Sequence, residues 1–193
     1  MVSAPSETAR AGARSWPRRN ALLARIGAVD DAVDRWVDRY RRPALDPLFY
    51  GLSSAADHAL LWMAIGALRA ARRGEPASGV RFAAALGAES ALTNGLIKLG
   101  FRRIRPVSAP AGPLPYGLHR PRTSAFPSGH ATSAFMAATL LSEGTGAAPA
   151  YFALASLVAA SRVYVRMHHA SDTLAGAVLG VALGQIAKRI LAR

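Results

Sequence analysis

Three short segments of this 193-residue chain carry the residue types that phosphate chemistry needs. They are a lysine and an arginine separated by six residues, a Pro-Ser-Gly-His run, and an arginine, a histidine and an aspartate within eleven positions (Lys98 and Arg105; 127–130; Arg162, His168 and Asp172). Fixed cations stabilise the negative charge that spreads over the oxygens of a phosphoryl group in transfer. One imidazole can attack phosphorus while another protonates the leaving oxygen. The set therefore predicts hydrolysis of a phosphate ester.

In this order, the three segments resemble the signature of the type 2 phosphatidic acid phosphatase superfamily, which includes membrane lipid phosphatases. Each segment is common by itself, but the three in series with these internal spacings are specific. The match runs from Lys98 to Asp172 and leaves the first 90 residues unexplained. The resemblance implies a metal-independent phosphoric monoester hydrolase with a histidine nucleophile and no cofactor.

The resemblance also implies a role for each matched side chain. His168 would be the nucleophile that becomes a phosphohistidine, and Asp172 would orient and charge its imidazole. His130 would be the general acid. The phosphate would be bound by three cationic side chains and by backbone N–H groups at a helix start (Lys98, Arg105 and Arg162; Ser128 and Gly129). The separation of four between His168 and Asp172 suits this pairing if a helix begins near the aspartate, because a carboxylate is stabilised at a helix N-terminus.

Length and composition predict the scaffold. The chain fits one domain, is 51% hydrophobic and contains 17 glycines, which favours a membrane protein. Five apolar stretches recur, several of them shorter than the roughly 20 residues of a bilayer span (about 47–68, 79–96, 129–141, 147–165 and 173–191). The predicted fold class is all-α, a polytopic membrane helix bundle of about five spans over residues 47–193. Gly176, Gly180 and Gly184 repeat every four residues, which favours close helix packing.

Polar side chains interrupt the first two stretches. Asp57 and His58 lie in the first, and Glu89 and Asn94 lie in the second. Such residues should point into the bundle. Asn94, one helical turn from Lys98, is predicted to support the site. Asp57 and Glu89 are expected to form structural hydrogen bonds between helices, although a contribution of these two residues or of His58 to substrate binding stays open.

Other cations and imidazoles are expected to lie outside the chemistry. His169 adjoins the proposed nucleophile, but only His168 has both family spacings, so His169 is expected to be a bystander. Arginines outside the matched positions, among them Arg102, Arg103 and Arg166, are expected to bind lipid headgroups or water in so basic a chain.

The N-terminal 42 residues differ from the rest. Residues 1–19 are rich in Ser, Ala, Pro and Arg and are predicted to form a disordered basic tail without a cleavable-signal pattern. In residues 20–42, apolar side chains recur at helical spacing and charged side chains occupy the other faces. We expect an amphipathic helix at the membrane interface, where Trp36 suits the headgroup region. A helix packed over the mouth of the bundle is the alternative.

Charge and span order indicate partners and topology. The net charge of +13 suits anionic lipid headgroups and a phosphate substrate, and no nucleic-acid fold signature is present. Cysteine is absent, and no carboxylates accompany the histidines at metal-ligand spacing. Alternating spans bring Lys98, His130 and His168 to one face of a cell (inner) membrane, and the basic residues lean towards the cytoplasmic face. The oligomeric state stays open.

The choice of substrate depends on the resemblance. A site at the membrane face suits an amphiphile whose phosphate reaches Lys98 while its tail stays in lipid. The short, Arg- and Ala-rich chain is similar to superfamily members that remove phosphate from decaprenylphosphoryl-5-phosphoribose during synthesis of cell-wall arabinan precursors. Phosphatases of undecaprenyl diphosphate, phosphatidylglycerophosphate or phosphatidic acid share the same site residues and are alternatives. A vanadate-dependent haloperoxidase and a non-enzymatic membrane scaffold are remote alternatives.

Overall fold

The computed structural model describes residues 20–106, 118–119, 121 and 123–191. In this part of the chain every regular element is a helix, which confirms the predicted all-α class. The α-helices are α2 (Ala21–Tyr40), α3 (Asp46–Ala55), α4 (Leu60–Arg73), α5 (Pro76–Ser90), α6 (Gly129–Leu141), α7 (Ala148–Tyr164) and α8 (Ala170–Leu191). They are joined in part by three 3-10 turns and one π-helical turn, namely η1 (Pro43–Leu45), η2 (Asp57–Ala59), η4 (Ile97–Gly100) and, as the π-helical turn, η3 (Ala91–Leu96). The tail predicted for residues 1–19 lies outside the described residues.

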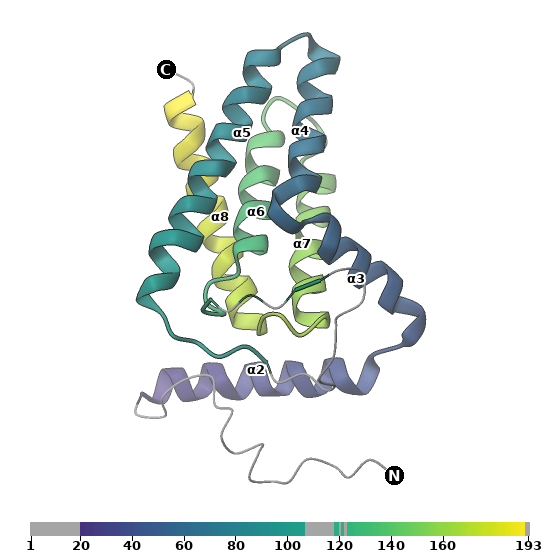
Figure 1. The fold of residues 1–193 in the computed structure, drawn as a ribbon, viewed down its shortest axis with the longest axis vertical. Helices are drawn as coiled ribbons and strands as arrows, with labels where there is room; N and C mark the ends of the chain where they lie inside the picture. The colour runs from purple at the N-terminus through teal and green to yellow at the C-terminus, as the bar shows by residue number, and fades with distance from the viewer. Residues whose placement is uncertain (1–19, 107–117, 120, 122, 192–193) are drawn as a thin grey trace.

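Helices α4 to α8 form a bundle, and α2 lies across one end of it (Figure 1). We call this the site end. The extension of α5, the start of α6, the end of α7 and the start of α8 all lie there. The turn between α4 and α5 and the C-terminal end of α8 lie at the opposite, far end (Figure 1). The chain therefore brings the three matched segments together, as the alternating direction of the helices predicts.

Local sequence signals set the helix ends. The Asn20 side chain accepts a hydrogen bond from the Leu22 backbone N–H at 2.9 Å and caps α2. Helix α4 ends at Gly74, whose φ of 67° lies in the left-handed region that favours glycine, and Pro76 begins α5. Ser128 caps α6, so this 13-residue helix begins among the matched residues, as predicted.

Helices α6 and α8 approach each other closely because α8 presents glycines to α6. A Cβ atom added at Gly176 would lie 2.6 Å from the carbonyl oxygen of Ser128. Added Cβ atoms at Gly180 and Gly184 would also collide with α6. The predicted role of these glycines is confirmed, and the close packing fixes the start of α6 relative to the start of α8.

An apolar core fills the bundle between the site end and the far end. Trp62 of α4, Phe82 and Leu86 of α5, Met136 of α6 and Val158 of α7 are buried together. Side chains of four helices therefore interlock, and core packing of this kind holds their ends in register.

The helices differ in apolar length. Among the described helices, α8 is the one that is long and apolar enough to cross a bilayer, judged by length and composition. Helix α7 has 17 residues, and α5 reaches the site end only because η3 and η4 extend it to Gly100. The predicted count of about five spans stays a prediction.

Candidate active site

A cavity of about 740 Å³ opens at the site end. Seven of the nine predicted site residues line it (Asn94, Lys98, Arg105, Gly129, His130, Arg162 and His168). They come from the extended α5, the segment that follows it, α6, α7 and the loop before α8. Side chains that are up to 74 positions apart in the sequence therefore meet around one space.

His168 has the geometry of a neutral imidazole whose lone pair is on Nε2, the nitrogen on the side of the cavity. Its Nδ1 atom lies 2.7 Å from the carbonyl oxygen of Ala125, which can only accept, so Nδ1 carries the proton. Its Nε2 atom lies 3.2 Å from Nη1 of Arg105, which can only donate. The lone pair of Nε2 therefore faces the cationic side of the cavity.

The surroundings of His168 keep it neutral. Burial lowers the pKa of His168 well below its usual value, and the nearby cations Arg105, Arg162 and Lys98 lower it further. A neutral imidazole is the nucleophilic form, because protonation would remove the lone pair.

Asp172 does not hold the imidazole of His168 as predicted. Its Oδ2 atom lies 3.8 Å from Nδ1 of His168, too far for a hydrogen bond, and accepts instead from the His169 backbone N–H at 2.8 Å. Nδ1 is already bonded to Ala125, and the other carboxylate oxygen of Asp172 is paired with Arg103. Asp172 therefore holds the backbone beside His168, and a main-chain carbonyl orients the ring.

Three cations at the cavity lack carboxylate partners. Lys98, Arg105 and Arg162 form no ion pair within the described part of the chain, and each is at least partly buried. Arg105 donates to the carbonyl oxygen of Met167 at 2.6 Å, and Arg162 donates to the hydroxyl of Ser53. Burial lowers the pKa of Arg105, yet a guanidinium stays charged at neutral pH. Three like charges around one space favour an anion there.

His130 contacts a carboxylate at the wall of the cavity. Its Nε2 atom lies 2.9 Å from Oδ1 of Asp57, which belongs to η2. The turn after Asp57 places His58 and Ala59 at φ of 51° and 58°, a conformation that costs energy in residues with a Cβ and clusters at functional sites. Asp57 thus contacts a site imidazole instead of making only a structural bond. Its position offered a signal, because an ionisable residue within an apolar stretch marks a functional site.

The start of α6 differs in one respect from the prediction. The Ser128 backbone N–H donates to the carbonyl oxygen of Asp172 at 3.0 Å and so is not directed at an anion. Gly129 does line the cavity, and a Cβ there would lie 2.8 Å from Oδ1 of Asn94, so a larger residue would displace that amide. Glu89 makes the expected bond between helices by accepting from a hydroxyl of α6 at 2.5 Å.

Helix α2 is joined to the site by a buried carboxylate, Asp30. Asp30 is fully buried and pairs with Arg103, which also pairs with Asp172. It accepts from the backbone N–H of Ser171 at 2.9 Å and from the Ser171 hydroxyl at 2.7 Å. The expectation that Arg103 binds lipid or water is therefore wrong. Sequence reasoning missed both charges, which bridge α2 to the first turn of α8.

A second group of charges on α2 contacts the same loop. Arg166 pairs with Asp34 at 2.5 Å and with Asp38, so the expectation that it binds lipid headgroups is also wrong. His169 lies 3.2 Å from the same aspartate, Asp34, and does not line the cavity, which fits a bystander.

The acidic face of α2 therefore packs over the end of the bundle, which was the alternative to an interfacial helix. A separate apolar stripe of the helix remains exposed (Leu22, Val29, Trp36 and Tyr40). Contact of this stripe with the membrane interface stays a prediction.

Comparison with known proteins defines the class. A transmembrane PAP2-type phosphatidylglycerolphosphate phosphatase from Bacillus subtilis shares the fold, with a TM-score of 0.70, 24% identity and 86% of each chain covered. LpxE of Aquifex aeolicus aligns with a TM-score of 0.64 and 26% identity over 82% of this chain and 93% of that one. The chain therefore has the helical fold of that transmembrane phosphatase.

The family follows from the sequence comparisons. The PAP2 superfamily model matches residues 78–193. The decaprenylphosphoryl-5-phosphoribose phosphatases of two Mycobacterium tuberculosis strains are each 34% identical over 148 residues, which are 75% of this chain and 80% of the relative. This chain belongs to the PAP2 superfamily.

Proposed function

We propose that this protein is an integral membrane phosphatase of about five spans that hydrolyses a polyprenyl-linked phosphomonoester, with decaprenylphosphoryl-5-phosphoribose as the best candidate. The observation that carries the proposal is the mixed lining of the 740 Å³ cavity, which combines cations and imidazoles with apolar residues. The lining includes three cations (Lys98, Arg105 and Arg162), three imidazoles (His58, His130 and His168) and small or apolar residues of η2, α4 and α5 (Ala59, Met63, Leu86 and Gly87). This lining suits a phosphate attached to a lipid.

The choice of lipid is supported by the relatives of the chain. The Mycobacterium tuberculosis enzymes that share 34% identity are named for decaprenylphosphoryl-5-phosphoribose. A cavity of this size falls within the range of about 300–1,000 Å³ typical of small-molecule sites, which leaves room for a pentose beside the phosphate. Undecaprenyl diphosphate, phosphatidylglycerophosphate and phosphatidic acid are the competing substrates.

The reaction runs through two displacements at phosphorus. First, Nε2 of His168 attacks, the P–O ester bond breaks, and the leaving alkoxide takes a proton from His130. Water then attacks the phosphohistidine, the P–N bond breaks, and the now neutral His130 takes a proton from that water. Inorganic phosphate and the lipid alcohol leave, and both imidazoles return to their starting states.

The other site residues stabilise these two reaction steps. Lys98, Arg105 and Arg162 face the phosphate oxygens and offset the charge that develops on them. Once the phosphate dianion neutralises these cations, the nearby Asp57 carboxylate favours the protonated ring of His130. Ala125 fixes the tautomer of His168. Asn94 supports the site beside Gly129.

We place the protein in the cell (inner) membrane, with the site end at the cytoplasmic face and α2 on the same side. Residues 20–193 would form one phosphatase domain, with the amphipathic segment 20–42 followed by the bundle 47–193. The exposed stripe of α2 supports contact with the interface, because Trp36 and Tyr40 are aromatic side chains suited to headgroups.

Phosphate release from reconstituted protein tests the proposal. Decaprenylphosphoryl-5-phosphoribose is compared with the three competing lipids at equal mole fraction. His168→Ala should abolish release, while the matched variant His169→Ala, which alters the adjacent imidazole outside the cavity, should keep most of it. Faster release from a competing lipid would overturn the substrate, and activity that survives His168→Ala would overturn the mechanism.

A further inference from the structure

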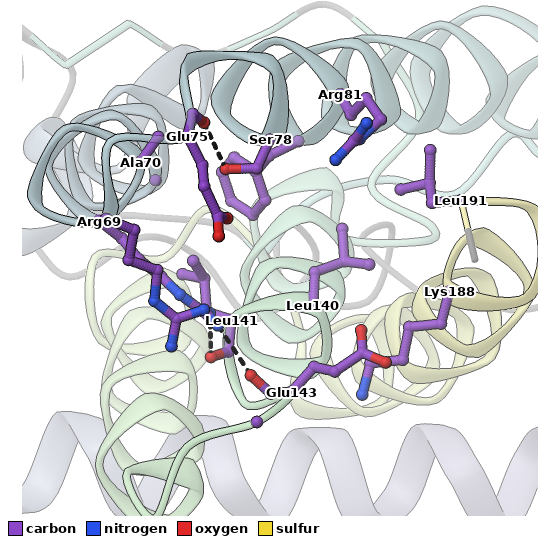
Figure 2. A pocket seen from close by; sticks show the side chains of 14 residues that line it. Arg69, Ala70, Glu75, Ser78, Arg81, Leu140, Leu141, Glu143, Lys188 and Leu191 are labelled. Atoms are coloured by element: carbon purple, nitrogen blue, oxygen red, sulfur yellow. Dashed lines mark hydrogen bonds between the residues drawn. The ribbon is translucent and has the colours of Figure 1, made fainter.

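A second cavity of about 370 Å³ lies at the far end of the bundle, between α4, α5, α6 and α8 (Figure 2). It shares no lining residue with the candidate active site. Its charged lining consists of four cations and two carboxylates (Arg69, Arg73, Arg81 and Lys188; Glu75 and Glu143). Cations are therefore in excess.

Three of the four cations, Arg73, Arg81 and Lys188, have no hydrogen-bond or ion-pair partner among the described residues. Arg69 is occupied, because its guanidinium donates to the carbonyl oxygens of Leu141 and Glu143 (Figure 2). Arg81 and Lys188 form no hydrogen bond or ion pair within residues 20–106, 118–119, 121 and 123–191. They reach the same side of the cavity from α5 and α8, with Leu191 beside them (Figure 2).

An apolar groove of about 340 Å³ adjoins this cavity. Arg81 and Leu191 line both spaces. From there the groove follows the seam of α5, α6 and α8 as far as Leu92, and its wall is almost entirely small or apolar (Ala84, Ala85, Ala88, Leu183, Ile186 and Ala187). Alanines on α5 leave the seam open, and Ile186 is 52% exposed along it. A cationic end thus continues into an apolar channel.

We propose that the cavity and the groove together bind an anionic glycerophospholipid in the leaflet opposite the active site. The phosphate would contact Arg81 and Lys188, and one acyl chain would occupy the groove. This inference rests on the membrane placement proposed above. Charge complementarity identifies the headgroup, because two unpartnered cations at a bilayer surface each attract an anionic lipid by about 1 kcal/mol.

The length of the groove identifies the chain. Eleven helical steps separate Arg81 from Leu92, which at about 1.5 Å each gives roughly 16 Å. That is about half of a hydrocarbon core of roughly 30 Å, the depth of one leaflet. A glycerolipid acyl chain matches this depth, whereas a chain of ten isoprene units would extend well beyond it.

Native mass spectrometry of the full chain in detergent tests the headgroup. The probes are dioleoyl phosphatidylglycerol and dioleoyl phosphatidylcholine, which have the same chains. We expect tighter binding of the anionic lipid, and about fivefold weaker binding of it in Arg81→Gln or Lys188→Gln. The matched control is Arg189→Gln, which removes an exposed charge that lines neither space. Equal affinity for the two lipids, or an equal loss in the control, would overturn the inference.

A second experiment tests whether the groove binds the acyl chain. Ala88→Phe places a ring in the channel and should weaken binding of both lipids severalfold, while glycerophosphoglycerol, which is the headgroup without chains, should not bind detectably. Binding of this headgroup as tight as that of the lipid would reduce the site to an anion site and refute the role of the groove. Lipid binding is measured without turnover, so failure of the phosphatase assay is a separate result.

Discussion

Replacing Asp30 tests whether α2 is part of the machinery that positions the site. Asp30 lies on α2, yet its carboxylate holds Ser171 at the start of α8 and Arg103 next to Asp172. In Asp30→Asn, one oxygen becomes an amide NH₂, which faces these donors and cannot accept from them. The loop that carries His168 then loses an anchor.

Two losses lower the free energy of unfolding of Asp30→Asn. Loss of a charge-assisted hydrogen bond costs about 1.5–3 kcal/mol, and a buried donor left without an acceptor costs about 1–3 kcal/mol. Arg103 keeps Asp172 as a partner, so we expect a total of about 3 kcal/mol. For a chain of 193 residues this corresponds to a fall in apparent Tm of about 6–12 °C. We also expect kcat/KM to fall about tenfold, or roughly 1.4 kcal/mol of transition-state stabilisation.

The assay is thermal unfolding of the detergent-solubilised protein together with phosphate release. Asp31→Asn is the matched control, because Asp31 is the neighbouring residue and is exposed on the outer side of α2. If Asp30→Asn and Asp31→Asn show the same Tm and the same kcat/KM, then α2 does not position the site and the reasoning is refuted.

Three further predictions concern the chemistry. The acid limb of kcat/KM should lie below pH 6.5, the usual pKa of histidine. The reason is that the pKa of His168 is depressed, so its neutral, nucleophilic form persists as the pH falls. A pH profile with its acid midpoint at 6.5 or above would contradict this. Asp57→Asn should move the alkaline limb of kcat to lower pH by about one unit, since the protonated His130 loses its carboxylate; an unmoved limb would remove Asp57 from the mechanism. EDTA should leave phosphate release unchanged, because the protein's own cations offset the phosphate charge; loss on chelation that a divalent ion restores would show the opposite.

The residues that surround the cavity could be predicted because their types and spacings carry the chemistry. His130 and His168 lie in short segments whose order along the chain matches a known signature, and alternating helices bring those segments to one end. The glycine repeat of α8 could likewise be interpreted, because only glycine allows helices to approach so closely.

The supporting contacts could not be predicted. Asp30 and Arg103 are 73 positions apart in a chain with 24 basic and 11 acidic residues, so no local pattern selects this pair. The acceptor at His168 is the backbone carbonyl of Ala125, and a carbonyl leaves no trace in residue type. Asp172 was assigned to the imidazole by the family resemblance, with its spacing from His168 as support, whereas its two oxygens accept from Arg103 and from the His169 N–H.

The most direct test is to trap the covalent intermediate. The protein is mixed with a phosphate-labelled lipid substrate, quenched in base, digested and sequenced by mass spectrometry. We predict an acid-labile, base-stable phosphoryl group on His168 and none in His168→Ala. A label on His130 or His169, or a label that persists when His168 is replaced, would contradict it.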